Sequence, residues 1–301
     1  MTGQLESPLP AVSQQPVYRG ASASAIQHHY DVSNDFYALW LDATRSYSCA
    51  LWAGEEDTLE AAQQRKLDYL AEAANVAGAA RVLDVGCGWG GMLHRLIEGH
   101  RVAHAVGLTL SAAQAEHVLR RADDRYEVRV ENWIDHEPTA PYEAIISIGA
   151  FEHFARFGMT RGARVAAYRQ FFERCYDWLP HGRRLVLQTN VKGNNVRLNR
   201  RTVRDLMFIV DHIFPESELP WMSEILEASE RCFDVGSARN DADHYARTCQ
   251  EWLVRLLASR ERAEELVGER MVADYTRYLQ AAVDAFTQRH LGLARIVFER
   301  V

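Results

Sequence analysis

The sequence predicts an α/β fold built on a doubly wound, Rossmann-like sheet, and three observations lead to this prediction. In the central part of the chain, short apolar runs alternate with longer segments of helix-forming residues, as strands and crossover helices do. A cluster of glycines follows the first of these runs and opens a helical segment, at the place where open α/β sheets bind ligands. The composition, with 48% hydrophobic and 25% charged residues among 301, is that of a folded chain with a sizeable core.

The N-terminal part is predicted to combine an arm with helices. Residues 1–20 are polar and contain several prolines, so we expect a mobile arm. Aromatic and apolar positions between 21 and 41 favour two short helices, separated near 31–34, where Asp, Ser and Asn side chains favour caps and turns. Residues 59–76 contain few helix breakers and many strong helix formers, which predicts a third helix.

The central segment is predicted to form a parallel sheet that helices cover on both faces. Its strands alternate with helices along the chain, and this alternation is typical of crossover connections. The expected strands are 81–85, 102–108, 128–131, 144–148 and 184–188, and the expected helices are 90–98, 111–123 and 165–179.

A mostly helical part follows the sheet. Residues from about 190 to 247 interrupt the alternation with helical segments and little strand character, so we interpret them as a lid inserted into the domain. A long helix over 249–288 and a last strand over 294–300 are expected after the lid. Residues 21–301 are therefore predicted to form one domain.

Charge and composition argue against several classes of protein. The net charge of −7 and the pI of about 6.0 disfavour a dedicated nucleic-acid-binding protein. No apolar run is long enough to span a bilayer and no secretory signal is recognisable, so a soluble, cytoplasmic protein is expected. The five cysteines include no C-x-x-C pair, which favours free thiols over a disulfide framework or a zinc site. No metal site is predicted.

The glycine cluster between the first strand and its helix is the strongest local signal. Gly86, Gly88 and Gly91 satisfy the G-x-G-x-x-G spacing, which by itself suggests a dinucleotide or only a generic turn. A dinucleotide site places an acid about 20 residues further on, and residues 107–114 contain none. Asp84, which precedes the glycines, and the crowded G-x-G-x-G-G pattern instead resemble the first motif of class I S-adenosylmethionine-dependent methyltransferases.

Further blocks narrow this resemblance to the family of cyclopropane-fatty-acyl-phospholipid synthases and mycolic acid methyltransferases. The blocks occur in the same order as in that family, with the glycine motif between them, from about residue 22 to the C-terminus. They are YDVSNDFY at 30–37, YSCA at 47–50, GLTLSAAQ at 107–114 and GAFEHF at 149–154.

The resemblance implies S-adenosylmethionine as cofactor and assigns residues to it. Tyr47 and Ser48 are expected at its methionine end, and Gly86 and Gly88 on its ribose side. Asp84 is expected beside the glycine turn, which it partly caps. Thr109, Leu110 and Gln114 are expected at the ribose, and Trp133 at the adenine. The alternatives are a core role for Trp133, a helix cap for Thr109 and an exposed helical position for Gln114; Asp84 alternatively caps its turn.

The chemistry implied by the resemblance is attack of an alkene on the sulfonium methyl group, which leaves a carbocation that must lose a proton. Similar proteins bind bicarbonate as the base. Cys49, Glu152 and Tyr245 match three of the residues that hold it, and Gln188 stands where similar proteins have the fourth, a histidine. Because Gln188 carries no charge, either the anion is held more weakly or Glu152 is itself the base. Core packing for Cys49 and Tyr245, a helix-capping role for Glu152 and a structural role for His153 are the alternatives.

The acceptor is expected to be amphiphilic. Two segments are expected to shape the acceptor pocket. One is 155–167, which is longer than in similar proteins, and the other is the lid. Basic residues precede an apolar stripe in the lid. This pattern suits a lipid-like or natural-product alkene with an anionic head, and it also suits peripheral contact with a membrane. The alternative is a solvated helix face above a packed core. The basic residues are Lys192, Arg197, Arg200, Arg201 and Arg204, and the stripe is Phe208, Ile209, Val210, Ile213 and Phe214.

The sequence therefore predicts a C-methyltransferase that transfers a methyl or methylene group to an alkene carbon. The alternative enzyme is a small-molecule methyltransferase that acts on an aromatic carbon, oxygen or nitrogen, with Glu152 as general base. A non-catalytic binding module is disfavoured by the intact glycine turn and Glu152.

Overall fold

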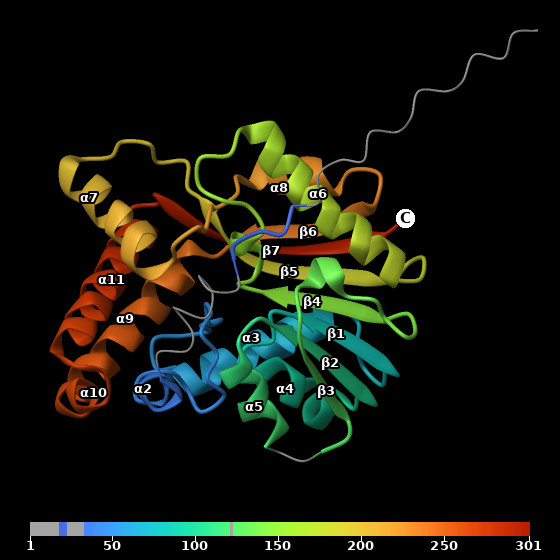
Figure 1. Cartoon of the computed structure of the whole chain (residues 1–301), viewed down its shortest axis with the longest axis horizontal. Coiled ribbons are helices and arrows are strands. Elements are labelled where there is room, and N and C mark those ends of the chain that lie inside the picture. The colour runs from blue at the N-terminus through green and yellow to red at the C-terminus, as the bar shows by residue number, and fades with distance from the viewer. Residues whose placement is uncertain (1–17, 23–32, 121–122) are drawn as a thin grey trace, which may run out of the picture.

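The computed structural model describes residues 18–22, 33–120 and 123–301, and its centre is a seven-stranded sheet with the order β3-β2-β1-β4-β5-β7-β6. Figure 1 shows this sheet with helices on both sides. The strands are β1 (Arg81–Val85), β2 (His104–Thr109), β3 (Tyr126–Val130), β4 (Ala144–Ile148), β5 (Arg184–Lys192), β6 (Phe233–Asn240) and β7 (Leu291–Arg300). The helices are α2 (Asn34–Ala38), α3 (Leu59–Ala73), α4 (Gly91–His100), α5 (Ala112–Leu119), α6 (Arg161–Trp178), α7 (Arg200–Phe208), α8 (Met222–Ser229), α9 (Ala242–Ala258), α10 (Arg260–Val267) and α11 (Glu269–Thr287).

The predicted doubly wound sheet is confirmed, and its first five strands are parallel. β1 pairs with β2 and β4, β2 pairs with β3, and β4 pairs with β5, all in parallel register. β7 runs antiparallel to both β5 and β6. The parallel sheet predicted for the alternating strands is therefore confirmed up to β5, and the structure adds β7 and β6 as antiparallel strands at one side of it.

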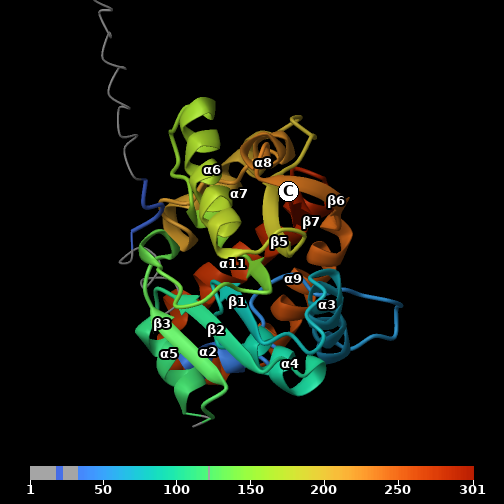
Figure 2. The same ribbon diagram turned by 90° about the vertical axis from the view of Figure 1, so that its right-hand side faces the viewer.

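Alternate side chains of each central strand enter different cores. Val82 of β1 and Ile146 of β4 pack with α3 and α4, whereas Leu83 and Ile145 pack on the opposite face with α6. Figure 2 shows α3 and α4 on the other side of the sheet from α6. Both faces are buried, which explains why these strands read as continuous apolar runs.

A third core joins the C-terminal helices to the N-terminal part of the chain. Phe36 and Trp40 pack with Trp252 of α9 and Tyr275 of α11. In Figure 1, α7, α9, α10 and α11 lie together on the left of the sheet, with α2 beside α10. This helical group stands beside the carboxyl ends of the parallel strands, where the site described below lies.

Two predictions for the C-terminal part are correct only in part. The segment interpreted as a helical lid, 190–247, contains the end of β5 and the whole of β6. β6 is an edge strand whose residues after Phe233 are exposed, so it lacks the apolar alternation that reveals a strand. The expected helix over 249–288 is three helices, and Gly268, with φ of 83°, separates α10 from α11.

The N-terminal predictions are tested only in part. Of the two helices expected between 21 and 41, the second is α2, which begins after Ser33 as N-cap, and the first falls outside the described residues. Residues 18–20 close the predicted arm and contact the body of the protein: Arg19 pairs with Asp135, and the Gly20 carbonyl accepts a bond from Arg156. Residues 1–17 of the arm lie outside the described residues.

Candidate active site

The glycine turn after β1 leaves space for a ligand at the carboxyl end of the sheet. Gly86 has φ of 85°, and a Cβ on it would lie 2.5 Å from the Cβ of Ala150, so only glycine fits there. A Cβ on Gly88, with φ of 54°, would meet nothing within 4 Å. The backbone at Gly88 is therefore open to close approach by a bound molecule.

The cavity above this turn, here called the glycine-turn cavity, has an empty volume of about 1040 Å³. Every residue that the sequence analysis assigned to the cofactor lines it, although these residues come from distant parts of the chain. They are Tyr47, Ser48, Asp84, Gly86, Gly88, Thr109, Leu110, Gln114 and Trp133.

Three residues of the cavity wall, Thr109, Gln114 and Trp133, had alternative structural roles that the local structure tests. Ser111 caps α5, so the alternative in which Thr109 is the cap is wrong. The Thr109 hydroxyl donates to Gln114 Oε1 at 2.8 Å, and Gln114 is 5% exposed, so the alternative of an exposed helical glutamine is also wrong. Trp133 packs edge-on against Phe171, as its alternative core role predicts, and it also lines the cavity.

A second and larger cavity, here called the apolar cavity, adjoins the first and has an empty volume of about 1730 Å³. Tyr47, Gly149 and His153 line both cavities and form the seam between them. Apolar side chains of α7 and the following π-helical turn form much of its wall, together with Glu152, Tyr245 and Phe157. The apolar wall residues of this segment are Leu206, Met207, Ile209, Val210 and Phe214.

Glu152 lies in a short 3-10 turn, Phe151–His153, that follows β4 at the seam. Its Oε1 accepts the backbone N–H of Asn190 at 2.7 Å. Its Oε2 is buried and has no hydrogen-bond partner among the described residues. Burial raises the pKa of this carboxyl to about 7, so it can take up or release a proton near neutral pH.

Two other polar groups of the cavity wall near Glu152, Tyr245 and His153, are uncharged. Burial raises the pKa of Tyr245 well above its ordinary value, and the ring packs on Phe286 at 4.6 Å between centroids. Burial lowers the pKa of His153 to about 4, and its Nδ1 lies 2.7 Å from the Ser217 hydroxyl. Of these three groups, Glu152 is the one that titrates near neutrality.

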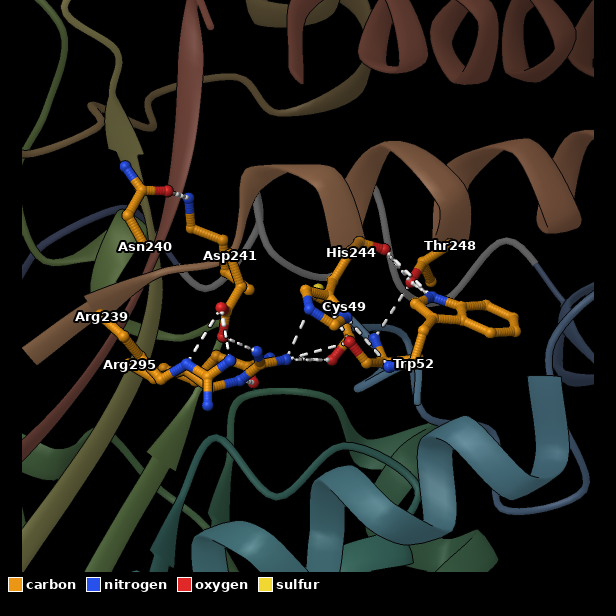
Figure 3. A network of polar contacts seen from close by, with 11 residues as sticks. Cys49, Trp52, Arg239, Asn240, Asp241, His244, Thr248 and Arg295 are labelled. Carbon is orange, nitrogen blue, oxygen red and sulfur yellow. Dashed lines mark hydrogen bonds and ion pairs between the residues drawn. The ribbon is translucent and has the colours of Figure 1, made fainter. Parts of the chain in front are cut away.

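Gln188 and Cys49 belong to a buried network behind the two cavities and line neither of them. Gln188 Oε1 accepts a bond from Arg295 Nε at 2.7 Å, and its Nε2 donates to the Cys49 carbonyl at 3.3 Å. Figure 3 shows Arg295 between Asp241 and the backbone of Cys49. Burial raises the pKa of the Cys49 thiol to about 12, so Cys49 stays a thiol.

The same network ties the loop that carries Tyr47 and Ser48 to α9. The Ala50 N–H donates to the Thr248 hydroxyl, and the Trp52 N–H donates to His244 Nδ1 at 2.9 Å. Figure 3 shows Trp52 against His244 and Thr248. One end of α9 therefore fixes the loop beside the glycine-turn cavity, and the same helix presents Tyr245 to the apolar cavity.

The basic residues of the predicted lid differ in their surroundings. Lys192 pairs with buried Glu218, and Arg201 lies 3.6 Å from Asp205. Arg197 and Arg200 are exposed next to Val196 and Leu198, which line the mouth of the apolar cavity and are 74% and 45% exposed. The rim therefore combines positive charge with exposed apolar surface.

Sequence reasoning missed two buried cations, Lys66 and Arg295, which are each 1% exposed. Lys66 lines the glycine-turn cavity on the buried face of α3, and Arg295 interrupts an otherwise apolar run in β7. A charged residue at a core position of a helix or strand was the available signal, because such a residue stays buried only with partners.

Comparison with known proteins agrees with this geometry. The family described as mycolic acid cyclopropane synthetase matches residues 19–296. The chain belongs to this family. It is 34% identical over 287 residues to cyclopropane mycolic acid synthase 2 of Mycobacterium leprae, which covers 90% of this chain and 92% of that protein.

Solved structures of the mycolic acid cyclopropane synthetase family superpose closely on this chain. The cyclopropane synthase MmaA2 from Mycobacterium tuberculosis has a TM-score of 0.86 at 30% identity and covers 93% of this chain and 99% of its own. The cyclopropane synthase CmaA1 complexed with SAH and CTAB has a TM-score of 0.85 at 31% identity, with the same coverage.

As a member of the mycolic acid cyclopropane synthetase family, the chain is an S-adenosylmethionine-dependent methyltransferase. The open backbone at Gly88 and the buried, unpartnered Oδ1 of Asp84 fit a polar ligand in the glycine-turn cavity. The five cysteines are free thiols. Within the described ranges, no helix is long and apolar enough to cross a membrane, and no group of His, Cys, Asp or Glu could hold a metal ion.

Proposed function

We propose that this protein transfers a methyl or methylene group to an alkene carbon of a lipid-like acceptor through a carbocation. The observation that carries the proposal is the position of Glu152, whose buried and unpartnered Oε2 lies in the wall of the apolar cavity beside the seam. An apolar wall suits a hydrocarbon acceptor, and an unsolvated carboxylate suits removal of a proton from a cation. The relatives named as cyclopropane synthases support the same chemistry.

The chain's own residues bring the acceptor to the cofactor and remove a proton. Bound S-adenosylmethionine supplies an electrophilic methyl group. The alkene π electrons form the new carbon–carbon bond, and the carbon–sulfur electron pair leaves with sulfur. The electron pair of a carbon–hydrogen bond in the new methyl group then closes a ring, or the electron pair of a C–H bond on a neighbouring carbon forms a double bond. In either case Glu152 takes the proton.

We propose that Glu152 acts as the base directly, without bicarbonate held by Gln188. Both ends of the Gln188 amide are engaged, by Arg295 and by the Cys49 carbonyl. The Cys49 carbonyl also accepts a bond from Arg295. These contacts leave Gln188 and Cys49 in the layer behind the cavities, so their roles in the proposed reaction are to position the Tyr47 loop. Tyr245 forms part of the wall that shields the cation from water.

We further propose that the acceptor is an amphiphile with an anionic head, held by the part of the lid between β5 and α8, residues 193–221. Its chain would lie against the apolar wall, and its head would meet Arg197 and Arg200 at the rim. The same rim supports peripheral contact with an anionic membrane or with a carrier of the acceptor.

The test is turnover of labelled S-adenosylmethionine with unsaturated phospholipids, acyl-carrier thioesters and terpenoid or polyketide alkenes, with and without added bicarbonate. The expected result is a cyclopropane or a methyl-branched alkene formed from an amphiphilic alkene, at a rate that bicarbonate does not change. Bicarbonate-dependent turnover would contradict the role given to Glu152. Methylation of an aromatic carbon, oxygen or nitrogen alone, detected by mass and NMR of the product, would overturn the alkene chemistry.

A further inference from the structure

The end of β5 places two polar side chains in the wall of the apolar cavity. Gln188, Asn190 and Lys192 alternate along this strand, so they share one face of it. Gln188 is engaged behind the cavity, whereas Asn190 and Lys192 line it. An amide and an ammonium group in a largely apolar wall are costly unless polar partners meet them. The acceptor is a possible source of such partners.

The side chain of Asn190 has an unmet hydrogen-bonding group. Its Oδ1 is buried and has no hydrogen-bond partner among the described residues, although Asn190 as a whole is half-buried. Rotation about χ2 is soft in asparagine, so the amide can present this oxygen to a ligand in the cavity. The backbone N–H of Asn190 donates to Glu152 Oε1 at 2.7 Å. The unmet oxygen therefore belongs to a direct neighbour of the proposed base.

The ammonium group of Lys192 has more donors than its neighbours use. Its Nζ pairs with Glu218 and lies 6.0 Å from the ring centroid of Trp221, and both of these residues line the same cavity. An ammonium group has three donors, and among the described residues one carboxylate accepts from Lys192. Glu218 is 7% exposed, and its backbone N–H donates to the Glu152 carbonyl at 3.2 Å. The ion pair is thus held beside the turn that carries Glu152, and Lys192 can also donate to an oxygen of a ligand.

A hydroxyl group satisfies both side chains, because it donates one hydrogen bond and accepts others. Asn190 and Lys192 are about 7 Å apart along the strand, and one oxygen atom with two hydrogen bonds of about 2.8 Å spans most of that distance. We propose that the acceptor is an alkene with a hydroxyl group a few carbon atoms from its double bond. This hydroxyl donates to Asn190 Oδ1 and accepts from Lys192. The alkene part of the inference rests on the proposed function, and the two hydroxyl contacts do not.

Three medium-chain ligands separate the two contacts. A homoallylic alcohol can donate and accept, its methyl ether can only accept, and the alkene without the oxygen can do neither. Their dissociation constants are measured by calorimetry on the protein loaded with S-adenosylhomocysteine, which excludes turnover. The wild type is expected to bind the alcohol most tightly, the ether next and the alkene least, with about 3- to 10-fold between successive ligands.

Two variants remove the contacts one at a time. Asn190→Leu keeps the size of the side chain and the backbone N–H that holds Glu152. It should weaken the alcohol by about 3- to 10-fold and leave the ether and the alkene within about twofold. Lys192→Met should weaken both the alcohol and the ether by about 10-fold and spare the alkene. Retained binding of the alkene also shows that each variant is folded.

The matched control is Asn195→Leu, which removes another asparagine from the wall of the same cavity. Both ends of the Asn195 amide are engaged, because its Nδ2 donates to the Gln288 carbonyl at 2.7 Å and its Oδ1 accepts the Arg197 N–H at 3.1 Å. Its loss should therefore affect the three ligands to the same extent.

Equal binding of the alcohol and the alkene by the wild type would overturn the inference. An equal loss of all three ligands in Asn190→Leu would overturn it too, since Asn190 would then only shape the cavity. Turnover of the alcohol and the alkene with labelled S-adenosylmethionine separates this inference from the proposed function. Methylation of both without preference, together with equal binding, would refute the hydroxyl site alone. Tighter binding of the alcohol without methylation of either ligand would refute the alkene chemistry and support the hydroxyl contacts.

Discussion

At the scale of single residues, the protonation state of Glu152 is expected to control turnover. Burial raises the pKa of Glu152 to about 7, so the carboxylate that accepts a proton becomes populated only as the pH rises through this value. Activity should therefore be low at pH 5, rise through about pH 7 and level off above it. The dependence of the rate on pH at saturating cofactor measures this directly.

Glu152→Gln provides the control for this pH dependence. The amide keeps an oxygen that can accept the Asn190 N–H, so the turn should retain its shape. Turnover is expected to fall by about 10²- to 10⁴-fold, the usual contribution of a positioned general base, while affinity for S-adenosylhomocysteine stays within about threefold. Near-normal turnover in this variant would exclude Glu152 as the base.

At the scale of elements, the sequence predicted buried strands well and edge elements poorly. β1 and β4 have the predicted bounds because both of their faces are apolar. β6 was missed because it forms through backbone pairing with β7 while its side chains face solvent. The break between α10 and α11 depends on the positive φ of Gly268, which a glycine in a helical pattern permits but does not require.

The buried ion pair between Arg295 and Asp241 is expected to hold β7, α9 and the Tyr47 loop together. Arg295→Met should lower the free energy of unfolding by about 1.5 to 3 kcal/mol, because Asp241 loses a charge-assisted hydrogen bond but keeps its ion pair with Arg239. Urea unfolding of the unliganded protein measures the change. The Arg295→Met, Asp241→Asn double variant should recover part of it; a purely additive further loss would indicate that the two residues act independently.

The rim of the predicted lid offers a separate test. Replacing Arg197 and Arg200 with Gln should raise the acceptor KM by roughly three- to tenfold, the range expected when exposed charge contacts are lost, without changing cofactor affinity. Arg204→Gln is the matched control, since Arg204 lies in the same segment but lines the groove toward α11. Equal effects of the two changes on KM would remove the rim from the acceptor site.

At the scale of the whole molecule, sequence motifs predicted the cofactor site better than the acceptor site. Tyr47, Thr109 and Gln114 belong to local sequence blocks, and all the predicted cofactor residues meet in one cavity. The apolar cavity instead depends on how α7, α9 and α11 pack over the strand ends. Arg295 reaches Cys49 across 246 residues of sequence, and such a contact leaves no local pattern.

The connection between the two cavities is expected to be the feature on which methyl transfer depends most. Gly149 lines both cavities, has φ of 69°, and a Cβ on it would meet nothing within 4 Å. Gly149→Ala should place a methyl group in the seam and lower kcat by about 10- to 100-fold, because small displacements of reacting groups cost rate steeply. Binding of S-adenosylhomocysteine should weaken by no more than about threefold.

The control for backbone strain is Gly182→Ala. Gly182 has φ of 74°, and a Cβ on it also meets nothing within 4 Å, but it lies in an exposed turn before β5, outside both cavities. Both variants should lose about 1 to 2 kcal/mol of stability from the left-handed conformation of alanine, measured by urea unfolding. Only Gly149→Ala should lose turnover, since only its methyl group stands between donor and acceptor. An equal loss of turnover in both would mean that strain, and not the seam, limits the rate.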